Sequence, residues 1–218
     1  MKLFIKLSVF ILLTTATASA FAYFFWYKPK FSKHTSVKTF DARHIDRNDA
    51  TFLRMKQKAI SINDFAKENN YNSTRCFLVD MRIASGLKRF FVYNFQKDSI
   101  EAAGLVTHGS GSHKGDAGLS FSNIPNSNAT SVGRYRIGKP YYGKFGLAYK
   151  LYGIDETNDK AFERFVVLHS HSCVPNDEVS PMPICESWGC PTVAPAFLSV
   201  LKKYIDNSGR PMLLWIYY

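Results

Sequence analysis

Near its C-terminal end the chain combines residue types that could carry out acyl-transfer chemistry. His169 and His171 precede a proline-containing loop, which leads into residues 185–191, CESWGCP. A thiolate nucleophile needs a nearby base, and a glycine before the cysteine lets backbone N–H groups approach a developing oxyanion. The pattern predicts Cys190 as a nucleophile, with a packed structural cysteine as the alternative.

These residues must be positioned by a strand and by the turn that carries Cys190. Residues 164–169 are β-branched and aromatic and end on His169, which predicts a strand with a histidine at its end. Residues 195–205 have helical periodicity with a proline near the start, so a helix is expected after the turn. A cysteine at a helix start would have a lowered thiol pKa.

The remaining segments predict a mainly β domain with a few helices, an α+β fold. Residues 48–70 have apolar side chains near helical spacing, with Asn48 and Asp49 as candidate N-caps, and predict one or two helices. The polar loop 109–118 is expected at the rim of a cleft. Aromatic and β-branched runs predict strands at 76–81, 89–95, 100–106, 133–138, 147–152 and 212–218.

The first 27 residues predict export. Lys2 and Lys6 flank the start of an apolar run, and residues 18–20, ASA, have the small-x-small form of a signal cleavage site. Because residues 21–27 prolong the apolar stretch, residues 7–27 could instead span a membrane as an uncleaved anchor. A removed signal peptide and a retained anchor remain alternatives.

The net charge of +11 is unevenly distributed, which bears on the partner. Residues 1–58 hold 11 Lys/Arg against 3 Asp/Glu, whereas residues 59–218 hold 17 against 14. The nearly balanced body does not favour nucleic acid as a partner. A basic segment after an apolar stretch instead favours an anionic membrane or wall, so residues 28–58 are expected to form a basic tether leading into the helical segment.

The histidine and cysteine segments resemble the active-site motif of the L,D-transpeptidase catalytic-domain family, in its YkuD-like, Ser-Trp-Gly-Cys-Pro branch. Seventeen residues separate His169 from Ser187, and 15 separate His171 from Ser187. Either spacing fits the family motif. The resemblance covers roughly residues 60–218. Other segments that carry it, in this order, are 79–80, 106–112, 121–123 and 141–146.

The resemblance implies a β-rich catalytic domain at residues 59–218, a β-sandwich or barrel with a helix after the catalytic cysteine. It also implies a covalent thioester mechanism without metal or organic cofactor. Carried over by position, Cys190 is the nucleophile and His169 the general base, with His171 as the reserve. Ser187 and Gly189 would shape the turn and the oxyanion site.

Four residues are expected to contact the substrate: His171, Trp188, Tyr142 and His108. Trp188 stands where the wider family has a second histidine before Gly-Cys, so any role of that histidine is absent. The alternatives are a hairpin that packs Tyr142 against its own face and a His108 that only caps a turn.

Cys173 and Cys185 bracket a loop of 11 residues. In an exported chain such a pair suggests a disulfide, which would contribute about 3 kcal/mol through loop closure. The competing interpretation is a zinc set drawn from His169, His171 and the three cysteines of this region, although no CxxC spacing is present. Cys76 is expected to be a packed thiol.

The resemblance implies the following reaction in the bacterial cell envelope, on its periplasmic side. Cys190 attacks a peptidoglycan tetrapeptide stem at the carbonyl joined to the terminal D-Ala, releases D-Ala, and passes the acyl group to an amine of a second stem. Water as the acceptor would make a carboxypeptidase or hydrolase. A non-catalytic or zinc-dependent murein-binding protein is the remaining alternative, and a monomer is expected.

Overall fold

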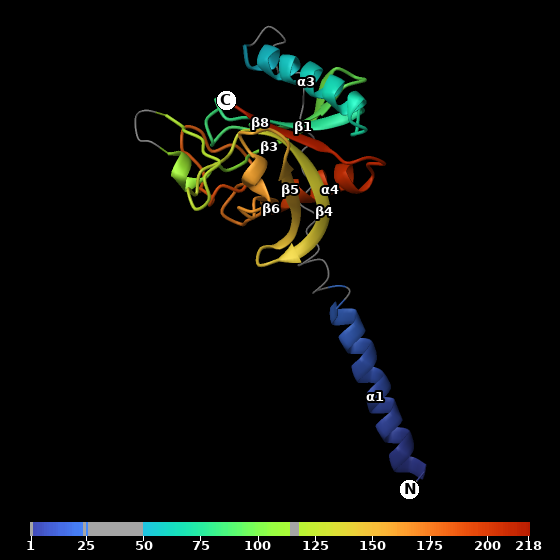
Figure 1. The fold of residues 1–218 in the computed structure, drawn as a ribbon. Helices are drawn as coiled ribbons and strands as arrows, with labels where there is room; N and C mark the ends of the chain where they lie inside the picture. The colour runs from blue at the N-terminus through green and yellow to red at the C-terminus, as the bar shows by residue number, and fades with distance from the viewer. Residues whose placement is uncertain (1, 24, 26–49, 114–117) are drawn as a thin grey trace. The chain divides into compact units, whose positions relative to one another are not determined.

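The computed structural model describes residues 2–23, 25, 50–113 and 118–218 (Figure 1). The chain divides into two compact units, Met1–Val37 and Lys38–Tyr218. Most of the predicted tether and the candidate caps Asn48 and Asp49 lie outside the described residues. So do positions 114–117 of the polar loop.

The first unit contains one helix, α1 (Lys2–Ala22). Its side chains from Leu12 to Tyr23 are exposed. Among the residues described, no helix combines the length and the apolar character needed to cross a membrane. Export by a signal peptide or an anchor therefore stays a prediction.

The second unit is built on one eight-stranded sheet with the order β3-β2-β1-β8-β4-β5-β6-β7. Neighbouring strands are antiparallel, except that β1 pairs with β8, and β6 with β7, in parallel. The β6–β7 pair needs a crossover, and that crossover carries the disulfide loop and Cys190. The strands are β1 (Arg75–Asp80), β2 (Phe90–Asn94), β3 (Ser99–Gly104), β4 (Gly133–Gly143), β5 (Gly146–Gly153), β6 (Val167–Ser170), β7 (Thr192–Val193) and β8 (Leu213–Tyr217).

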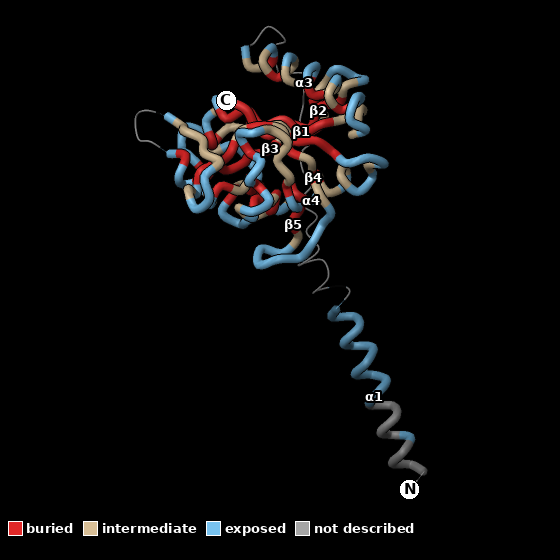
Figure 2. The backbone as a smooth tube through the Cα atoms, viewed as in Figure 1, coloured by how far each residue is buried: buried red, intermediate tan, exposed pale blue. Residues whose placement is uncertain are grey.

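The two faces of the sheet bury separate cores because side chains alternate along a strand. In β1, Phe77 and Val79 join the core that includes helix α4 (Pro195–Asp206), whereas Leu78 joins the core beneath helix α3 (Ala50–Glu68). Figure 1 shows α3 and α4 on opposite sides of the sheet. Along the tube in Figure 2 the central strands are buried, while the tip of the β4–β5 hairpin is exposed.

The strand ladder is open, and a few backbone contacts join its two ends. Val106, just beyond β3, forms an isolated bridge with Val193 of β7. The Thr107 N–H donates to Thr192 O at 2.9 Å, and Gly109 bridges Ser187. These contacts bring the segment after β3 against the segment that carries Cys190.

The predicted mainly β fold with a few helices is confirmed, and the strand boundaries shift by a few residues. The strand expected to end at 138 continues to Gly143 in β4. The strand expected at 164–169 starts late, because β6 begins only at Val167. Phe165 has a φ of 56° and lies in a turn, where the Val166 N–H donates to Ala161 O. Its left-handed backbone cannot continue a strand. Residues 50–68 form one helix, α3, rather than two.

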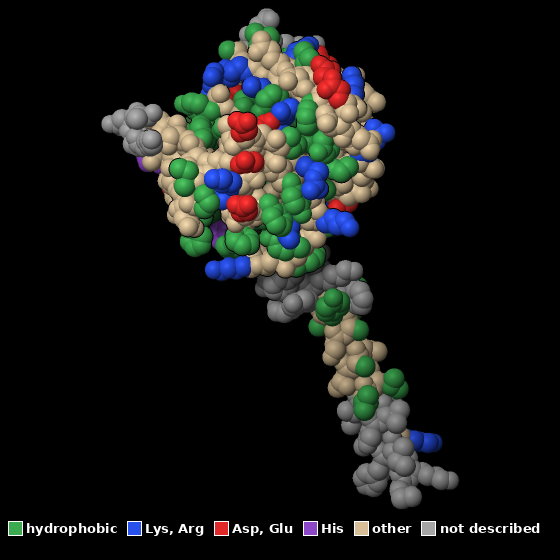
Figure 3. All heavy atoms as spheres, viewed as in Figure 1, with side chains coloured by type: hydrophobic (Ala, Val, Ile, Leu, Met, Phe, Trp, Pro, Cys, Tyr) green, Lys and Arg blue, Asp and Glu red, His purple; other side chains and the backbone are tan. Residues whose placement is uncertain are grey.

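Several charged side chains on the second unit form ion pairs. Arg54 binds the buried Asp80, and similar pairs join Arg75 to Glu101 and Arg134 to Asp155. On the face seen in Figure 3, basic and acidic side chains are interspersed rather than gathered into one basic patch.

A substitution tests how much α3 depends on its buried face. Ile62 is 0% exposed in the core between α3 and the sheet, and Ile60 on the same helix is 57% exposed. Ile62→Ala should lower the free energy of unfolding by about 3 kcal/mol, because it removes buried methyl groups and leaves a cavity. Ile60→Ala, the same chemical change, should alter it by less than about 0.5 kcal/mol. Urea unfolding of both variants provides the comparison, and equal losses would contradict this packing.

Candidate active site

The turn that carries Cys190 is closed by Ser187. The Ser187 hydroxyl donates to Cys190 O at 2.7 Å and accepts the Gly189 N–H at 3.2 Å. Gly189 has a φ of 106°, and a Cβ atom there would lie 2.7 Å from Ala129 O. A side chain at this position would be strained by the backbone and blocked by a carbonyl, so the turn requires glycine.

A second glycine allows a neighbouring loop to approach this turn. A Cβ atom on Gly109 would collide with Asn128 O and would lie 2.8 Å from Gly189 Cα. The Ser187 N–H donates to His108 O at 2.9 Å, and the Ser110 N–H donates to Ser187 O at 2.8 Å. The Cys190 turn is thus held against residues 108–110 by backbone hydrogen bonds.

The Cys190 thiol is half-buried beside the turn that precedes β6. Its Sγ atom lies 3.5 Å from the Val167 N–H, which donates to it, and 3.8 Å from Phe165 O. Burial raises the pKa of Cys190, and the Val167 N–H and the Arg164 charge lower it by less. The expectation of a pKa lowered by a helix start is wrong, because β7 follows Cys190 and α4 begins only at Pro195.

Arg164, which sequence analysis missed, connects the loops around Cys190. Its guanidinium donates to Ser122 O at 2.8 Å and to Ala129 O at 2.6 Å. Ala129 O is also the carbonyl that crowds Gly189. Arg164 therefore fixes the wall behind the Cys190 turn and supplies a positive charge that lowers the pKa of the thiol.

His169 is buried at the end of β6, where a backbone carbonyl and a hydroxyl hold its ring. Nδ1 lies 3.2 Å from Ser170 O, and Nε2 lies 3.0 Å from the Thr192 hydroxyl. A carbonyl only accepts, so Nδ1 carries the proton and Nε2 presents its lone pair. Burial lowers the pKa of His169, the Ser170 carbonyl raises it by less, and His171 lowers it further.

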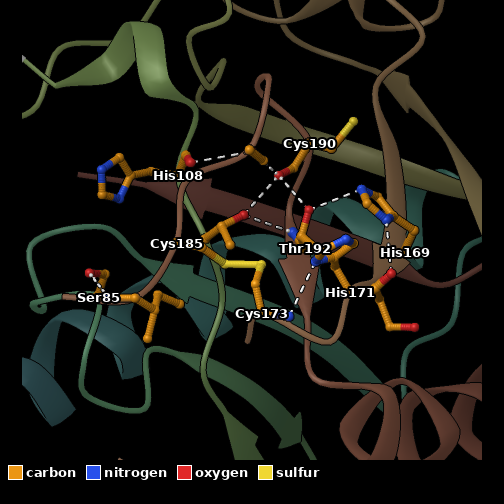
Figure 4. Close-up of a disulfide and its surroundings, with 12 residues drawn as sticks. Ser85, His108, His169, His171, Cys173, Cys185, Cys190 and Thr192 are labelled. Atoms are coloured by element: carbon orange, nitrogen blue, oxygen red, sulfur yellow. Dashed lines mark hydrogen bonds between the residues drawn. A yellow bond between two sulfur atoms is a disulfide. The ribbon is translucent and has the colours of Figure 1, made fainter. Parts of the chain in front are cut away.

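In the described structure no hydrogen bond joins His169 to Cys190. Figure 4 shows Thr192 between the His169 ring and the Cys190 backbone. The Thr192 hydroxyl has a second acceptor in Cys190 O, at 3.4 Å. A turn of this hydroxyl toward Cys190 O would free the Nε2 lone pair of His169 for a proton.

Cys190 opens into a pocket of ≈ 200 Å³. Five residues singled out from the sequence for a catalytic or substrate role line it, namely Cys190, His169, His171, Ser187 and Trp188. Cys173 also lines it, and so do four residues without an assigned role: Thr107, Phe145, Glu186 and Thr192. Thr192 follows Cys190 by two positions, a same-face spacing that could have revealed it.

The predicted substrate residues fall into two groups. His171 and Trp188 are exposed at the pocket, and Phe145 stacks on His169 with ring centroids 4.9 Å apart. Tyr142, in contrast, is 83% exposed near the tip of the β4–β5 hairpin and does not line the pocket. His108 lies behind the pocket rather than in its lining.

His108 is buried between a cation and an anion. Arg89 Nη2 lies 3.0 Å from His108 Nδ1, and Glu186 Oε1 lies 3.3 Å from His108 Nε2. In the described structure His108 Nε2 makes no hydrogen bond, so its contact with Glu186 is electrostatic and not an aligned hydrogen bond. Burial and then the Arg89 charge lower the pKa of His108, while Glu186 raises it by less.

Cys173 and Cys185 form a disulfide across the loop at the pocket (Figure 4). Because both sulfur atoms are covalently bound to each other, they cannot ligate zinc, and the zinc set that includes them is ruled out. Cys76 is free and buried, and Cys190 is free and half-buried. Of the four cysteines, Cys190 is thus the accessible thiol.

The sequence profile of the L,D-transpeptidase catalytic domain matches residues 47–217. The chain belongs to this family. The match covers the whole sheet, α3, α4 and the pocket around Cys190. No curated protein matches the chain significantly.

Solved structures show distant similarity. An L,D-transpeptidase from Xylanimonas cellulosilytica has 13% identity and a TM-score of 0.36, covering 71% of this chain and 68% of that one. LdtMt1 in complex with imipenem has 10% identity and a TM-score of 0.39, covering 66% and 59%. A fused Zn-dependent amidase/peptidase/peptidoglycan-binding domain protein from Clostridium acetobutylicum has 14% identity and a TM-score of 0.36. The match covers 75% of this chain and 62% of that one. The family assignment rests on the sequence profile.

Removing the disulfide should destabilise the protein. The bond closes a loop with a sequence separation of 12, so Cys173→Ser/Cys185→Ser should lower the free energy of unfolding by about 3 kcal/mol. Alkylation of the denatured chain should modify two cysteines before reduction and all four after it. Four modified cysteines without reduction would contradict the bond.

The raised pKa of Cys190 predicts slow alkylation at neutral pH. Only the thiolate reacts, so the rate of iodoacetamide labelling of the folded protein should rise with pH to a midpoint above the ordinary value of 9.0. Mass spectrometry at a series of pH values gives this rate, and Cys190→Ala should remove the labelling. A midpoint well below 9.0 would instead indicate a preformed thiolate–imidazolium pair.

Proposed function

We propose that the protein is a cysteine-dependent L,D-transpeptidase acting on peptidoglycan tetrapeptide stems. The observation that carries the proposal is that Cys190 and His169 open into one pocket within a domain of the L,D-transpeptidase family. Cys190 attacks the carbonyl before the terminal D-Ala, the C–N bond breaks, and D-Ala leaves as its amine. A thioester remains, and an amine of a second stem then displaces the sulfur.

The hydrogen bonds of His169 support its role as the base. Ser170 O holds the Nδ1 proton, so the Nε2 lone pair can accept the thiol proton once the Thr192 hydroxyl turns to Cys190 O. The lowered pKa keeps the imidazole neutral at neutral pH and ready to accept. The same proton then passes to the leaving amine of D-Ala.

Because the pKa of Cys190 is raised, the transfer of its thiol proton to His169 is part of the acylation step. In the resting protein the thiol keeps its proton, so attack requires His169 to remove it as the C–S bond forms. A thiol that keeps its proton until substrate arrives is less prone to side reactions, because only the thiolate is nucleophilic.

The Cys190 N–H is the best candidate for an oxyanion donor. The Gly189 N–H already donates to the Ser187 hydroxyl. The Cys190 N–H has no partner in the described part of the chain and sits on the turn that Ser187 closes. A donor of this kind, fixed before substrate binds, stabilises the negative charge on the carbonyl oxygen.

We place the protein in the bacterial cell envelope, with the second unit exported to the periplasm. Lys2, Lys6 and the small-x-small residues 18–20 lie in or beside an apolar run. The Cys173–Cys185 disulfide also favours an oxidising compartment. N-terminal sequencing of the protein from bacterial cells would distinguish a removed signal peptide from a retained inner-membrane anchor.

The thioester mechanism is tested by incubating the protein with purified disaccharide tetrapeptide. Intact-mass analysis should show the acyl adduct on wild type and none on Cys190→Ala, with equimolar D-Ala released. His169→Gln should slow acylation by at least about 100-fold, because the base is lost. The acylation rate should fall toward acid pH as His169 becomes protonated. The midpoint of this fall should lie below 6.5, the ordinary pKa of histidine.

The matched control is His171→Gln, a neighbouring histidine that is exposed at the same pocket. Its acylation rate should change little if His169 is the base. A large loss in His171→Gln with little change in His169→Gln would reverse the assignment. No adduct and no D-Ala with wild type would favour a murein-binding protein without turnover.

A further inference from the structure

The pocket beside Cys190 contains a single carboxylate among its lining residues, that of Glu186. The Glu186 side chain is 37% exposed, so it can reach a ligand in the pocket. It precedes Ser187, whose hydroxyl donates to Cys190 O, so the carboxylate is on the segment that positions the thiol. The proton transfers proposed above do not use it.

A buried cation lies behind this carboxylate. Arg89 is 0% exposed, and its hydrogen bonds go to neutral acceptors, namely Val106 O at 3.0 Å, Ile83 O at 3.1 Å and His108 Nδ1 at 3.0 Å. Burial lowers the pKa of Arg89 to about 10, which leaves it charged at neutral pH. The charge therefore polarises the His108 ring toward Glu186.

The Arg89 contact also decides the tautomer of His108. A guanidinium only donates, so Nδ1 accepts and the ring proton of neutral His108 is on Nε2. That N–H faces Glu186 Oε1 at 3.3 Å. His113 completes a trio with His108 and Glu186 whose ligand atoms lie within 4.8 Å, but Nε2 offers a proton here rather than a lone pair for a metal.

The arrangement thus presents one anion to the pocket, with His108 Nε2 3.3 Å behind it. In the proposed reaction the donor stem enters with the negative carboxylate of its terminal D-Ala. The acceptor enters as an ammonium ion, because ordinary alkyl amines are protonated at neutral pH. A single carboxylate at the pocket repels the first and attracts the second.

We propose that Glu186 binds the ammonium group of the acyl acceptor and so favours transfer to an amine over hydrolysis. The inference rests on the proposed transpeptidase function and concerns its second step. The bound ammonium loses one proton to neutral His169, the amine forms a C–N bond with the thioester carbonyl, and the C–S bond breaks. The Cys190 thiolate takes the proton back from His169, and the second ammonium proton goes to solvent.

The test separates the two half-reactions in the full-length protein. Acyl-enzyme formed from disaccharide tetrapeptide is mixed with increasing Nα-acetyl-lysine amide, which carries one side-chain ammonium and no carboxylate. In Glu186→Gln the amine concentration for half-maximal aminolysis should rise about tenfold, and the hydrolysed share of product should increase. Acyl-enzyme formation should be at least as fast as in wild type, because the carboxylate that is removed only repels the donor stem.

Two further variants serve as controls. Glu186→Asp keeps the charge and should retain most of the preference for the amine, and Glu68→Gln, at the exposed end of α3, should match wild type. If the amine concentration for half-maximal aminolysis is unchanged in Glu186→Gln, the inference is overturned while the thioester mechanism stays intact. Slower acylation in that variant would assign the carboxylate to the donor and also overturn it. No acyl-enzyme in wild type would instead refute the proposed function itself.

Discussion

The active-site geometry depends on the close backbone contact between residues 106–110 and residues 187–193. These two segments join opposite ends of the open sheet through the Val106–Val193 bridge and the hydrogen bonds of Ser187. The contact is close because Gly109 and Gly189 carry no side chain at the point of approach. Everything else at the pocket is placed relative to this junction, including the thiol of Cys190 and the ring of His169.

Fixing the turn in this way has an electrostatic consequence. The thiol is half-buried and its pKa is raised by this burial, whereas burial lowers the pKa of His169. Both groups are thus neutral at rest, and ionisation is delayed until the proton moves between them during attack. Thr192, whose hydroxyl can bond to either His169 or Cys190 O, is suited to control that movement.

The buried Arg89 gives the pocket a second organised region. A desolvated cation must be satisfied by hydrogen bonds, and two backbone carbonyls and the His108 ring supply them. This demand orients His108 toward Glu186 and connects the core of the sheet to the pocket. The thiol side and the carboxylate side are joined through Ser187, whose N–H donates to His108 O and whose hydroxyl donates to Cys190 O.

By itself the sequence determined the fold class, most strands, the helix α4, and the candidate residues Cys190, His169 and Ser187, because periodicity and motif spacing are local properties. It could not show that Phe165 turns the chain before β6, that β7 separates Cys190 from α4, or that Tyr142 lies away from the pocket. Nor could it pair Arg89 with His108 or place Glu186 and Thr192 at the pocket. Those relations depend on burial and on contacts between segments distant in the chain, which only the tertiary structure decides.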